Sequence, residues 1–367
     1  MNRIFYLHSL ALLLFFTSPA CGSAVDEAPA ELPPSTSTVG RAAIRDMVLI
    51  YDSYWTYRPD WNGEMFEPYV SSALPDGSHQ WLFDGFLFIE FTDGPRQFCS
   101  GYGRANARKE EWIKLVEHQL FSEGLSMQAL DARIEKVKPL APDHGRRKVV
   151  MTLPEPIFRQ EDWGELNGKA LNFSDNDDRI AACCWYVDHV VDRYLEAGLK
   201  NLQLAGFYWV AEAVGESRAV VRAVADHVHS RNLNFYWIPY FNATGYSQWA
   251  DFGFDEAWLQ PNYFFSETVP LWRLDEACLI ADQYRMSNEF EFDKDALAGN
   301  GKRQRMIDYI DAFTRHGVFR DKNIAYYEGG GDLYKLRYGA EQDFALYRQL
   351  TDTVAERQRR FYESTFN

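Results

Sequence analysis

Residues 202–209 read LQLAGFYW, a short run of apolar and aromatic residues that is typical of a buried β-strand. Residues 178–197, just before it, have an apolar stripe at the three- and four-residue steps of an amphipathic helix, and Gly198 follows where a glycine commonly ends a helix. The stripe consists of Ile180, Cys184, Val187, Val191 and Tyr194. Residues 216–231 form a second predicted helix. A strand between two helices is the repeating unit of a parallel α/β sheet.

The same alternation of strand and helix continues in both directions along the chain. The other predicted strands are residues 47–52 (MVLIYD), 81–91 (WLFDGFLFIEF), 148–153 (KVVMTL), 234–240 (NFYWIPY), 256–264 (EAWLQPNYF), 288–292 (NEFEF) and 323–328 (NIAYYE). The other predicted helices are residues 109–123 with a further turn of helix to 137, 269–284, 301–316 and 340–361, and a short one near 66–72. Eight strands with helices between them favour a single-domain (β/α)8 TIM barrel.

The N-terminus predicts export. Arg3 precedes a short apolar run at residues 10–16, which is typical of a signal peptide, here residues 1–20. Cleavage before Cys21 suits a bacterial lipoprotein with lipid on that cysteine, and an ordinary secretory peptide is the alternative. Residues 21–40 are rich in Pro, Ser, Thr and Ala and predict a disordered tether, which leaves residues 41–367 for the barrel. We therefore expect a protein of the bacterial cell envelope, lipid-anchored in the periplasm or at the cell surface, or else secreted.

Charge and cysteine spacing exclude several kinds of partner. The formal net charge of −15 repels phosphate backbones, so we expect no nucleic-acid partner. Cys99, Cys183, Cys184 and Cys278 lack metal-ligand spacing, which leaves either one disulfide or buried thiols and predicts no metal site. The chain has no dinucleotide fingerprint or P-loop, and the glycines at residues 329–331 suggest a rim loop. We expect no cofactor, a monomer, and membrane contact only through the lipid anchor.

The active site of such a barrel lies at the C-terminal ends of the strands, and in this chain those ends are rich in acids, amides and aromatic rings. These are the groups that recognise sugars, because hydroxyls need convergent donors and acceptors and pyranose faces pack on rings. We expect poly- or oligosaccharide as the partner. The predicted substrate-binding residues are Asp52, Asp84, Trp55, Tyr208, Trp209, Tyr240, Asn242, Gln260, Asn262, Tyr263, Glu289, Asp293, Tyr327 and Glu328.

Two carboxyl groups are the usual requirement for glycoside hydrolysis, and many barrel glycosidases place them after strands four and seven. Glu212 follows the fourth predicted strand. Glu289, Glu291 and Asp293 alternate along the seventh, so their side chains share one face. We interpret Glu212 as general acid/base and Glu291 as nucleophile, with Glu289 or Asp293 as its alternative orienting partner. Such acids can also merely bind a hydroxyl or pair with an arginine such as Arg285.

Several of these segments resemble successive blocks of a known family. The blocks are residues 81–88 (WLFDGFLF), Asp178-Arg179 with residues 185–188 (WYVD), residues 202–209 with Glu212, residues 260–264 (QPNYF) and residues 289–293 (EFEFD). They are similar to the bacterial domain of unknown function 4855 family and cover nearly the whole mature chain. The resemblance implies a barrel protein of carbohydrate-degrading bacteria, without a settled activity, and includes Glu212 and Glu291 in its blocks.

Three functions are compatible with these features. The first is an exported glycoside hydrolase with a retaining mechanism. The second is a surface lipoprotein that binds glycans on a barrel without chemistry. The third is a scaffold protein whose aromatic rim docks a protein partner. The sequence leaves open the sugar, its linkage, and endo or exo action, because these depend on the shapes of the loops around the pocket.

Overall fold

The eight strands predicted from the sequence form a closed parallel barrel in the computed structural model, which describes residues 38–55 and 57–366. The strands are β1 (Asp46–Tyr51), β4 (Gly85–Ile89), β7 (Arg147–Leu153), β10 (Leu202–Trp209), β11 (Asn234–Trp237), β12 (Glu256–Leu259), β13 (Ser287–Glu291) and β14 (Ile324–Tyr327). Each pairs in parallel with its neighbours along the chain, and β14 closes onto β1. The predicted (β/α)8 TIM barrel is confirmed. The predicted signal peptide, the lipidation site at Cys21 and most of the tether lie outside the described residues.

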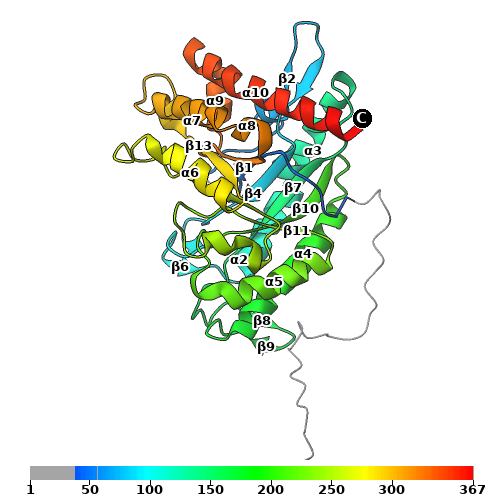
Figure 1. Ribbon diagram of the computed structural model, residues 1–367. Coiled ribbons are helices and arrows are strands. Elements are labelled where there is room, and N and C mark those ends of the chain that lie inside the picture. The colour runs from blue at the N-terminus through cyan, green and yellow to red at the C-terminus, as the bar shows by residue number, and fades with distance from the viewer. Residues whose placement is uncertain (1–37, 56, 367) are drawn as a thin grey trace, which may run out of the picture.

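The helices surround this barrel (Figure 1). The longer ones are α2 (Lys109–Phe121), α3 (Ser126–Val137), α4 (Asn176–Ala197), α5 (Arg218–Ser230), α6 (Trp272–Gln283), α7 (Arg303–Arg315) and α10 (Glu341–Phe366). Helix α4 ends as predicted, because Gly198 adopts a left-handed φ of 63°. At its start the Asp175 carboxylate accepts a hydrogen bond from the Asp177 backbone N–H at 2.9 Å, so Asp175 caps the helix. Among the described residues no helix is both long and apolar enough to cross a bilayer.

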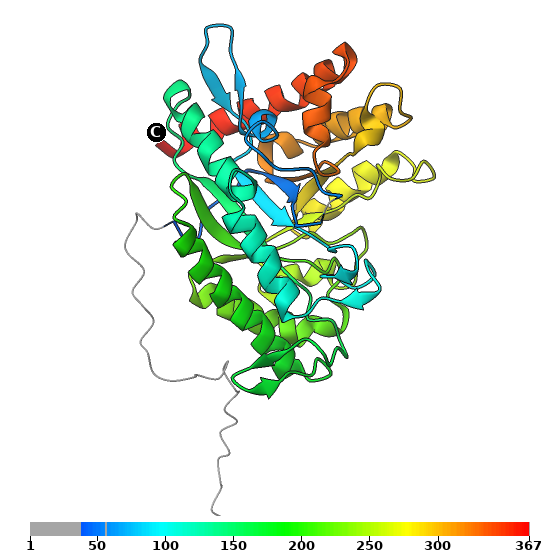
Figure 2. The same cartoon turned by 180° about the vertical axis from the view of Figure 1, so that it is seen from behind.

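Shorter elements decorate the connections between strands and helices. The short helices are α1 (Glu67–Val70), α8 (Val318–Asp321) and α9 (Asp332–Tyr338), and the 3-10 turns are η1 (Lys138–Leu140), η2 (Gly215–Ser217), η3 (Tyr246–Phe252) and η4 (Lys294–Ala296). Three small pairs lie outside the barrel: β2 (Ser71–Ala73) with β3 (His79–Trp81), β5 (Arg96–Gln97) with β6 (Ala105–Asn106), and β8 (Glu165–Leu166) with β9 (Lys169–Ala170). The β2–β3 hairpin projects at the same end of the molecule as α10, and β8–β9 lies at the far end (Figures 1 and 2).

Alternation of side chains along the strands divides the apolar core into two layers. In β10, Phe207 and Trp209 pack in the layer between barrel and helices, whereas Tyr208 belongs to the cluster inside the barrel. Gly206 permits the close approach of β11, because a Cβ atom there would lie 2.1 Å from the Asn234 carbonyl oxygen. Only inward-facing residues near the C-terminal ends can therefore reach a site inside the barrel.

The N-terminal end of the barrel is closed by α10. Arg357 on this helix is fully buried and bonds the Asp46 carboxylate at the start of β1, with 2.7 Å between Nε and Oδ1. Gln358 donates to the other oxygen of Asp46 at 2.8 Å. The predicted strand 81–91 is divided at this end of the barrel, because β3 ends at Trp81 and β4 begins only at Gly85, after Asp84.

Candidate active site

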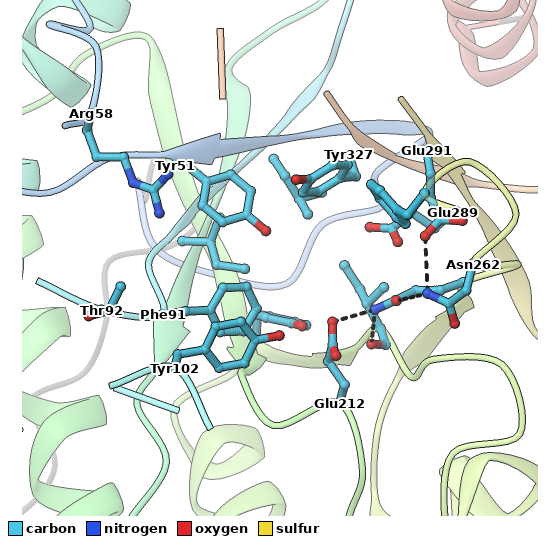
Figure 3. Close-up of a pocket in the computed structure, with 16 residues that line it drawn as sticks. Tyr51, Arg58, Phe91, Thr92, Tyr102, Glu212, Asn262, Glu289, Glu291 and Tyr327 are labelled. Carbon is cyan, nitrogen blue, oxygen red and sulfur yellow. Dashed lines mark hydrogen bonds between the residues drawn. The ribbon is translucent and has the colours of Figure 1, made fainter. Parts of the chain in front are cut away.

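A cavity of about 380 Å³ opens at the C-terminal mouth of the barrel (Figure 3). This volume lies within the range of small-molecule sites. Its lining consists of Leu49, Tyr51, Arg58, Ile89, Phe91, Thr92, Tyr102, Tyr208, Glu212, Ile238, Gln260, Asn262, Phe265, Glu289, Glu291 and Tyr327. Seven of these were predicted as site residues from their positions at strand ends: Tyr208, Glu212, Gln260, Asn262, Glu289, Glu291 and Tyr327.

Glu212 reaches the cavity from the loop that follows β10. Tyr208 faces the barrel interior near the end of the strand, and Glu212 lines the cavity from the loop that follows. Gln260, just beyond β12, donates a hydrogen bond from Nε2 to Glu212 Oε1 at 2.8 Å. An amide donor holds the orientation of a carboxyl group without supplying a charge, so Glu212 remains free to exist in either protonation state.

Glu289 and Glu291 both come from β13 and lie beside each other across the cavity from Glu212 (Figure 3). They are two residues apart, so they share a face of the strand, and both are almost fully buried, with exposed fractions of 3% and 1%. Tyr309 on α7 donates its hydroxyl to Glu291 Oε2. Among the described residues, no side chain or backbone group donates a hydrogen bond to Glu289. The two neighbouring acids therefore have different surroundings.

Gln260 and Asn262 connect the acids on the two sides of the cavity. Asn262 Nδ2 donates to Gln260 Oε1 at 2.8 Å and lies 3.4 Å from Glu291 Oε1, which makes a continuous path from Glu212 to Glu291. The path consists of the contact from Glu212 to Gln260, the Gln260 amide, which spans about 2.3 Å, and the contacts from Gln260 to Asn262 and from Asn262 to Glu291. Its length limits the distance between Glu212 Oε1 and Glu291 Oε1 to about 11 Å. Asn262 adopts a positive φ of 50°, a conformation that asparagine tolerates better than most residues.

Burial raises the pKa of all three acids. Burial raises the pKa of Glu212, and the hydrogen bond from Gln260 acts against this rise. For Glu289, burial and then the charges of Glu291 and Glu212 raise the pKa well above its usual value. Burial raises the pKa of Glu291 to about 7, and the bond from Tyr309 is the main opposing influence. Glu291 is thus held closer to the ionised state than its neighbour Glu289.

An aromatic wall faces Glu289 and Glu291 across the cavity. It consists of Tyr51, Phe91 and Tyr102 (Figure 3), and the rings of Phe91 and Tyr102 are stacked with centroids 4.4 Å apart. Arg58 lies beyond Tyr51, with its guanidinium 4.9 Å from the centre of that ring. Both nitrogens of its fork bond the carboxylate of Glu90, Nε and Nη2 each at 2.6 Å. Arg58 thus faces the mouth with its charge already matched.

Several of the residues predicted to bind substrate do not line the cavity: one lies at the other end of the barrel, and another lies at a strand end but points outward. Asp84 precedes β4, so it sits at the opposite end of the barrel, where it accepts hydrogen bonds from the backbone of Arg45 and Asp46. Trp209 neighbours Tyr208 on β10 and therefore points outward into the helix layer. The expectation that these two residues line the mouth is wrong, because it ignored where a strand starts and which way it alternates.

Three further predicted residues lie close behind the mouth and have protein partners. Tyr263 donates its hydroxyl to Asp308 at 2.7 Å and does not line the cavity. Asp293 lies beyond the end of β13 and caps the 3-10 turn η4 by accepting from Asp295 N at 2.8 Å. The Glu328 carboxylate is enclosed by the backbone N–H groups of Gly330, Gly331 and Leu333 and by the Tyr69 hydroxyl. The glycine run predicted as a rim loop therefore wraps a carboxylate of the same chain.

The last four predicted residues lie on loops beside the cavity and do not line it. Tyr240 and Asn242 are exposed after β11. Asp52 and Trp55 line a separate hollow of about 240 Å³ next to Arg58. There Asp52 Oδ1 lies 3.1 Å from Nε2 of His118 on α2.

Sequence reasoning also missed part of the cavity lining. Tyr51 ends β1 and Phe91 lies two residues past β4, and both belong to the inner cluster, so the alternation along residues 47–52 and 81–91 carried a usable signal. Arg58 and Tyr102 come from long loops after β1 and β4, whose paths no local pattern specifies. Phe265 lies just past β12, next to predicted residues. As for metals, the described residues contain no group of three or more His, Cys, Asp or Glu that could hold an ion.

The fold and the site together define a class, the (β/α)8 barrels whose mouth gathers acidic residues. Within this class the chain belongs to the family of domains of unknown function DUF4855, whose model matches residues 46–352. The family resemblance stated from the sequence is thereby confirmed. No curated protein matches the chain significantly.

Solved structures resemble the chain at low sequence identity, with TM-scores below 0.5. A xylanase and α-amylase inhibitor protein from Scadoxus multiflorus has 10% identity and a TM-score of 0.43, covering 85% of this chain and 97% of its own. A GH18 chitinase from Pseudoalteromonas aurantia has 9% identity and a TM-score of 0.44, covering 82% and 99%. A tryptophan synthase α-subunit from Pyrococcus furiosus has 9% identity and a TM-score of 0.39, covering 84% and 97%. These likenesses concern the fold, so function must be argued from the site itself.

Proposed function

We propose that this protein is a glycoside hydrolase that uses Glu212 as general acid/base and Glu291 as nucleophile in a retaining mechanism. The observation that carries the proposal is the pair of carboxyl groups that face one cavity from β10 and β13 with different partners. Glycoside hydrolysis needs one carboxyl that gives a proton and one that is ionised. Burial raises the pKa of Glu212, which suits an acid, and Tyr309 and Asn262 donate to Glu291, which suits an anion.

The chemistry then proceeds in two balanced steps. Glu291 attacks the anomeric carbon while Glu212 gives its proton to the departing glycosidic oxygen, which forms a glycosyl ester and releases the first sugar. A water molecule then loses a proton to Glu212 and displaces Glu291 from the anomeric carbon. The stacked rings of Phe91 and Tyr102 offer a surface on which the sugar packs during both steps.

The test is hydrolysis of a panel of plant and bacterial polysaccharides by the wild type, Glu212→Gln and Glu291→Gln, with reducing ends as the readout. We expect each variant to lose about 10²- to 10⁴-fold in rate. Asp293→Asn is the matched control, because it replaces an acid beyond the same strand that does not line the cavity, and asparagine also caps helical turns well. Anomeric configuration of the first product, followed by NMR, separates retention from inversion.

Glycan affinity without any reducing ends released would contradict the hydrolase and favour the glycan-binding lipoprotein. In that case Glu291→Gln would leave affinity largely unchanged. Binding of a protein partner, with no affinity for any glycan in the panel, would favour the scaffold.

Export and lipid anchoring form a separate part of the proposal. They are supported by Arg3, the apolar run at residues 10–16 and Cys21. Mass spectrometry of the mature protein from a bacterial host should show a diacylglyceryl cysteine at position 21, and Cys21→Ser should release the protein from the membrane fraction. An unmodified N-terminus in the wild type would favour plain secretion.

A further inference from the structure

Glu289 is the acid in the cavity that a two-carboxylate reaction leaves without a task. Its side chain lines the cavity and is only 3% exposed. Glu212 accepts from Gln260 and Glu291 accepts from Tyr309, but within residues 38–55 and 57–366 no donor contacts the carboxyl of Glu289. The carboxyl oxygens of Glu289 are not enclosed by protein and face the open cavity, where a donor group on a ligand can reach them.

The electrostatic surroundings of Glu289 narrow the chemistry of that donor. The titratable groups that interact with it are acids or phenols: Glu291 on its own strand, Glu212 after β10, Tyr51 on β1, Tyr208 on β10, Tyr327 on β14 and Tyr309 on α7. Among the residues that line the cavity, Arg58 is the one cation, and it is matched by the fully buried Glu90. A uronate, sulfate or phosphate group would therefore meet like charge without compensation.

We propose that the cavity takes a sugar bearing an ammonium group, a hexosamine without an N-acetyl substituent, and that Glu289 is the carboxylate that binds this ammonium. The inference rests on the proposed hydrolase and names the substrate class of the same site. An ammonium is a pure donor, so it satisfies a carboxylate that has no donor from the protein. A hydrogen bond between charged partners is also about twice as strong as a neutral one.

The opposite wall of the cavity suits the same ligand. Tyr51, Phe91 and Tyr102 present aromatic rings toward Glu289 and Glu291 (Figure 3). An ammonium within reach of such rings gains attraction from their negative faces, whereas an acetamide gains only packing. An N-acetyl group would also replace the charge with a neutral amide and leave Glu289 without a counter-ion.

Binding of an ammonium should release a proton from the site. Burial and the charges of Glu291 and Glu212 raise the pKa of Glu289, which favours its protonated form before a ligand binds. A bound cation favours the carboxylate, so the proton leaves as the ligand enters. Titration calorimetry in buffers of different ionisation enthalpy measures this release directly.

The experiment uses matched oligosaccharides that differ only in one substituent, a hydroxyl, an acetamido or an ammonium group at carbon 2. The β-1,4-gluco, α-1,4-galacto and β-1,6-gluco series are tested for hydrolysis by the wild type and for binding to Glu291→Gln. We expect the ammonium form to bind about tenfold or more tightly than its counterparts, with proton release. Adding Glu289→Gln to the Glu291→Gln protein should remove both that preference and the proton release. It should change the affinity for the hydroxyl form little. Asp293→Asn should change neither.

The outcomes for the substrate class and for the hydrolase are distinct. One outcome is that the protein hydrolyses or binds the hydroxyl or acetamido forms, and that Glu289→Gln does not alter its preference for the ammonium form. This outcome would overturn the substrate class and leave the hydrolase in place. Preferential, proton-releasing binding of ammonium forms without cleavage in any series would retain the ligand and overturn the hydrolase. Failure to bind any ammonium sugar would overturn the inference.

Discussion

The two ends of the barrel bury the same kinds of acidic side chain in opposite ways. At the N-terminal end, Asp46 accepts hydrogen bonds from Arg357, Gln358 and Tyr326, each at 2.7 or 2.8 Å. At the C-terminal mouth, Glu212, Glu289 and Glu291 receive only amide and phenol donors or none. Asp46 has a cation as partner, whereas among residues 38–55 and 57–366 no cation contacts Glu212, Glu289 or Glu291.

This difference shows how one fold separates stability from function. A buried carboxylate that is paired with a cation has a fixed charge and holds elements together. Buried carboxyls without a cation have raised pKa values and attract ligands of opposite charge. Helix α10 thus closes the N-terminal end of the barrel, and the mouth keeps buried acids whose pKa values are raised. The two ends should therefore respond oppositely to removal of a charge.

The largest effect should follow from Arg357→Met. This change leaves Asp46 as a fully buried charge without its cation, and breaking such a pair costs about 3 to 5 kcal/mol. It also removes donors to the backbone carbonyls of Phe319 and Lys322. Urea denaturation should show the loss in the free energy of unfolding.

The control for this prediction is Arg348→Met on the same helix. Arg348 pairs with Asp352 at 3.0 Å on the surface, where such pairs contribute little. A midpoint that shifts equally in both variants would mean that the buried network at the N-terminal end does not hold α10 onto the barrel.

A smaller effect of opposite sign is expected from Glu289→Gln. The pKa of this acid is raised in the folded protein by burial and by Glu291 and Glu212, so the folded state binds more protons than the unfolded state above the ordinary glutamate pKa. Stability from this group is therefore present at low pH and is lost as pH rises. Glu289→Gln should be more stable than wild type at pH 8, by an amount on the order of 1 kcal/mol, and should gain little at pH 4.5.

The measurement is the free energy of unfolding of both proteins at several pH values from 4.5 to 8. The difference between variant and wild type is the useful quantity, because Glu328 also has a pKa raised by burial to about 7 and contributes a slope to both proteins. A difference that is constant with pH would show that Glu289 does not change protonation in this range.

The barrel itself was readable from the sequence because apolar runs of strand length alternate with amphipathic helical segments. The prediction failed in detail at residues 81–91, where Trp81, Leu82 and Phe83 are apolar enough to extend a strand pattern. In the structure Leu82 and Phe83 donate backbone hydrogen bonds to Val70 and Tyr69, outside the barrel. Tertiary contacts thus decide where β4 begins. As a result, Asp84 lies at the N-terminal end of the barrel, away from the cavity.

The acids of the mouth were also predictable, because the ends of parallel strands meet at one edge whatever the loops do. The orientation of neighbouring residues was not, and the sequence named both Tyr208 and Trp209 although only Tyr208 faces inward. The bulge between Leu204 and Gly206 sets this parity, and Gly206 is the one local sign of it in the sequence. Arg58 and Tyr102 reach the cavity through loops held by distant contacts, such as the bond from Arg58 to Glu90.

The smallest predicted effect concerns the donor that distinguishes Glu291 from Glu289. Tyr309→Phe removes the hydroxyl that bonds Glu291 and keeps the ring, which packs against Phe290 and Phe313. Burial already raises the pKa of Glu291 to about 7, and the loss of this donor should raise it further. The acidic limb of the pH–rate profile should therefore move to higher pH. At pH values below this limb, the rate should fall about tenfold for each pH unit by which the limb moves.

Carbon-13 NMR of labelled glutamate carboxyls gives the same titration without a substrate, so this prediction does not depend on hydrolysis. Tyr263→Phe is the matched control, since its ring lies 5.9 Å from Tyr309 while its hydroxyl bonds Asp308, outside the cavity. A titration of Glu291 that moves equally in both variants would mean that packing around the tyrosines, and not the hydrogen bond, sets its protonation. A change confined to Tyr309→Phe would show that the Tyr309 hydroxyl lowers the pKa of Glu291 in a cavity whose described lining cation, Arg58, is paired with Glu90.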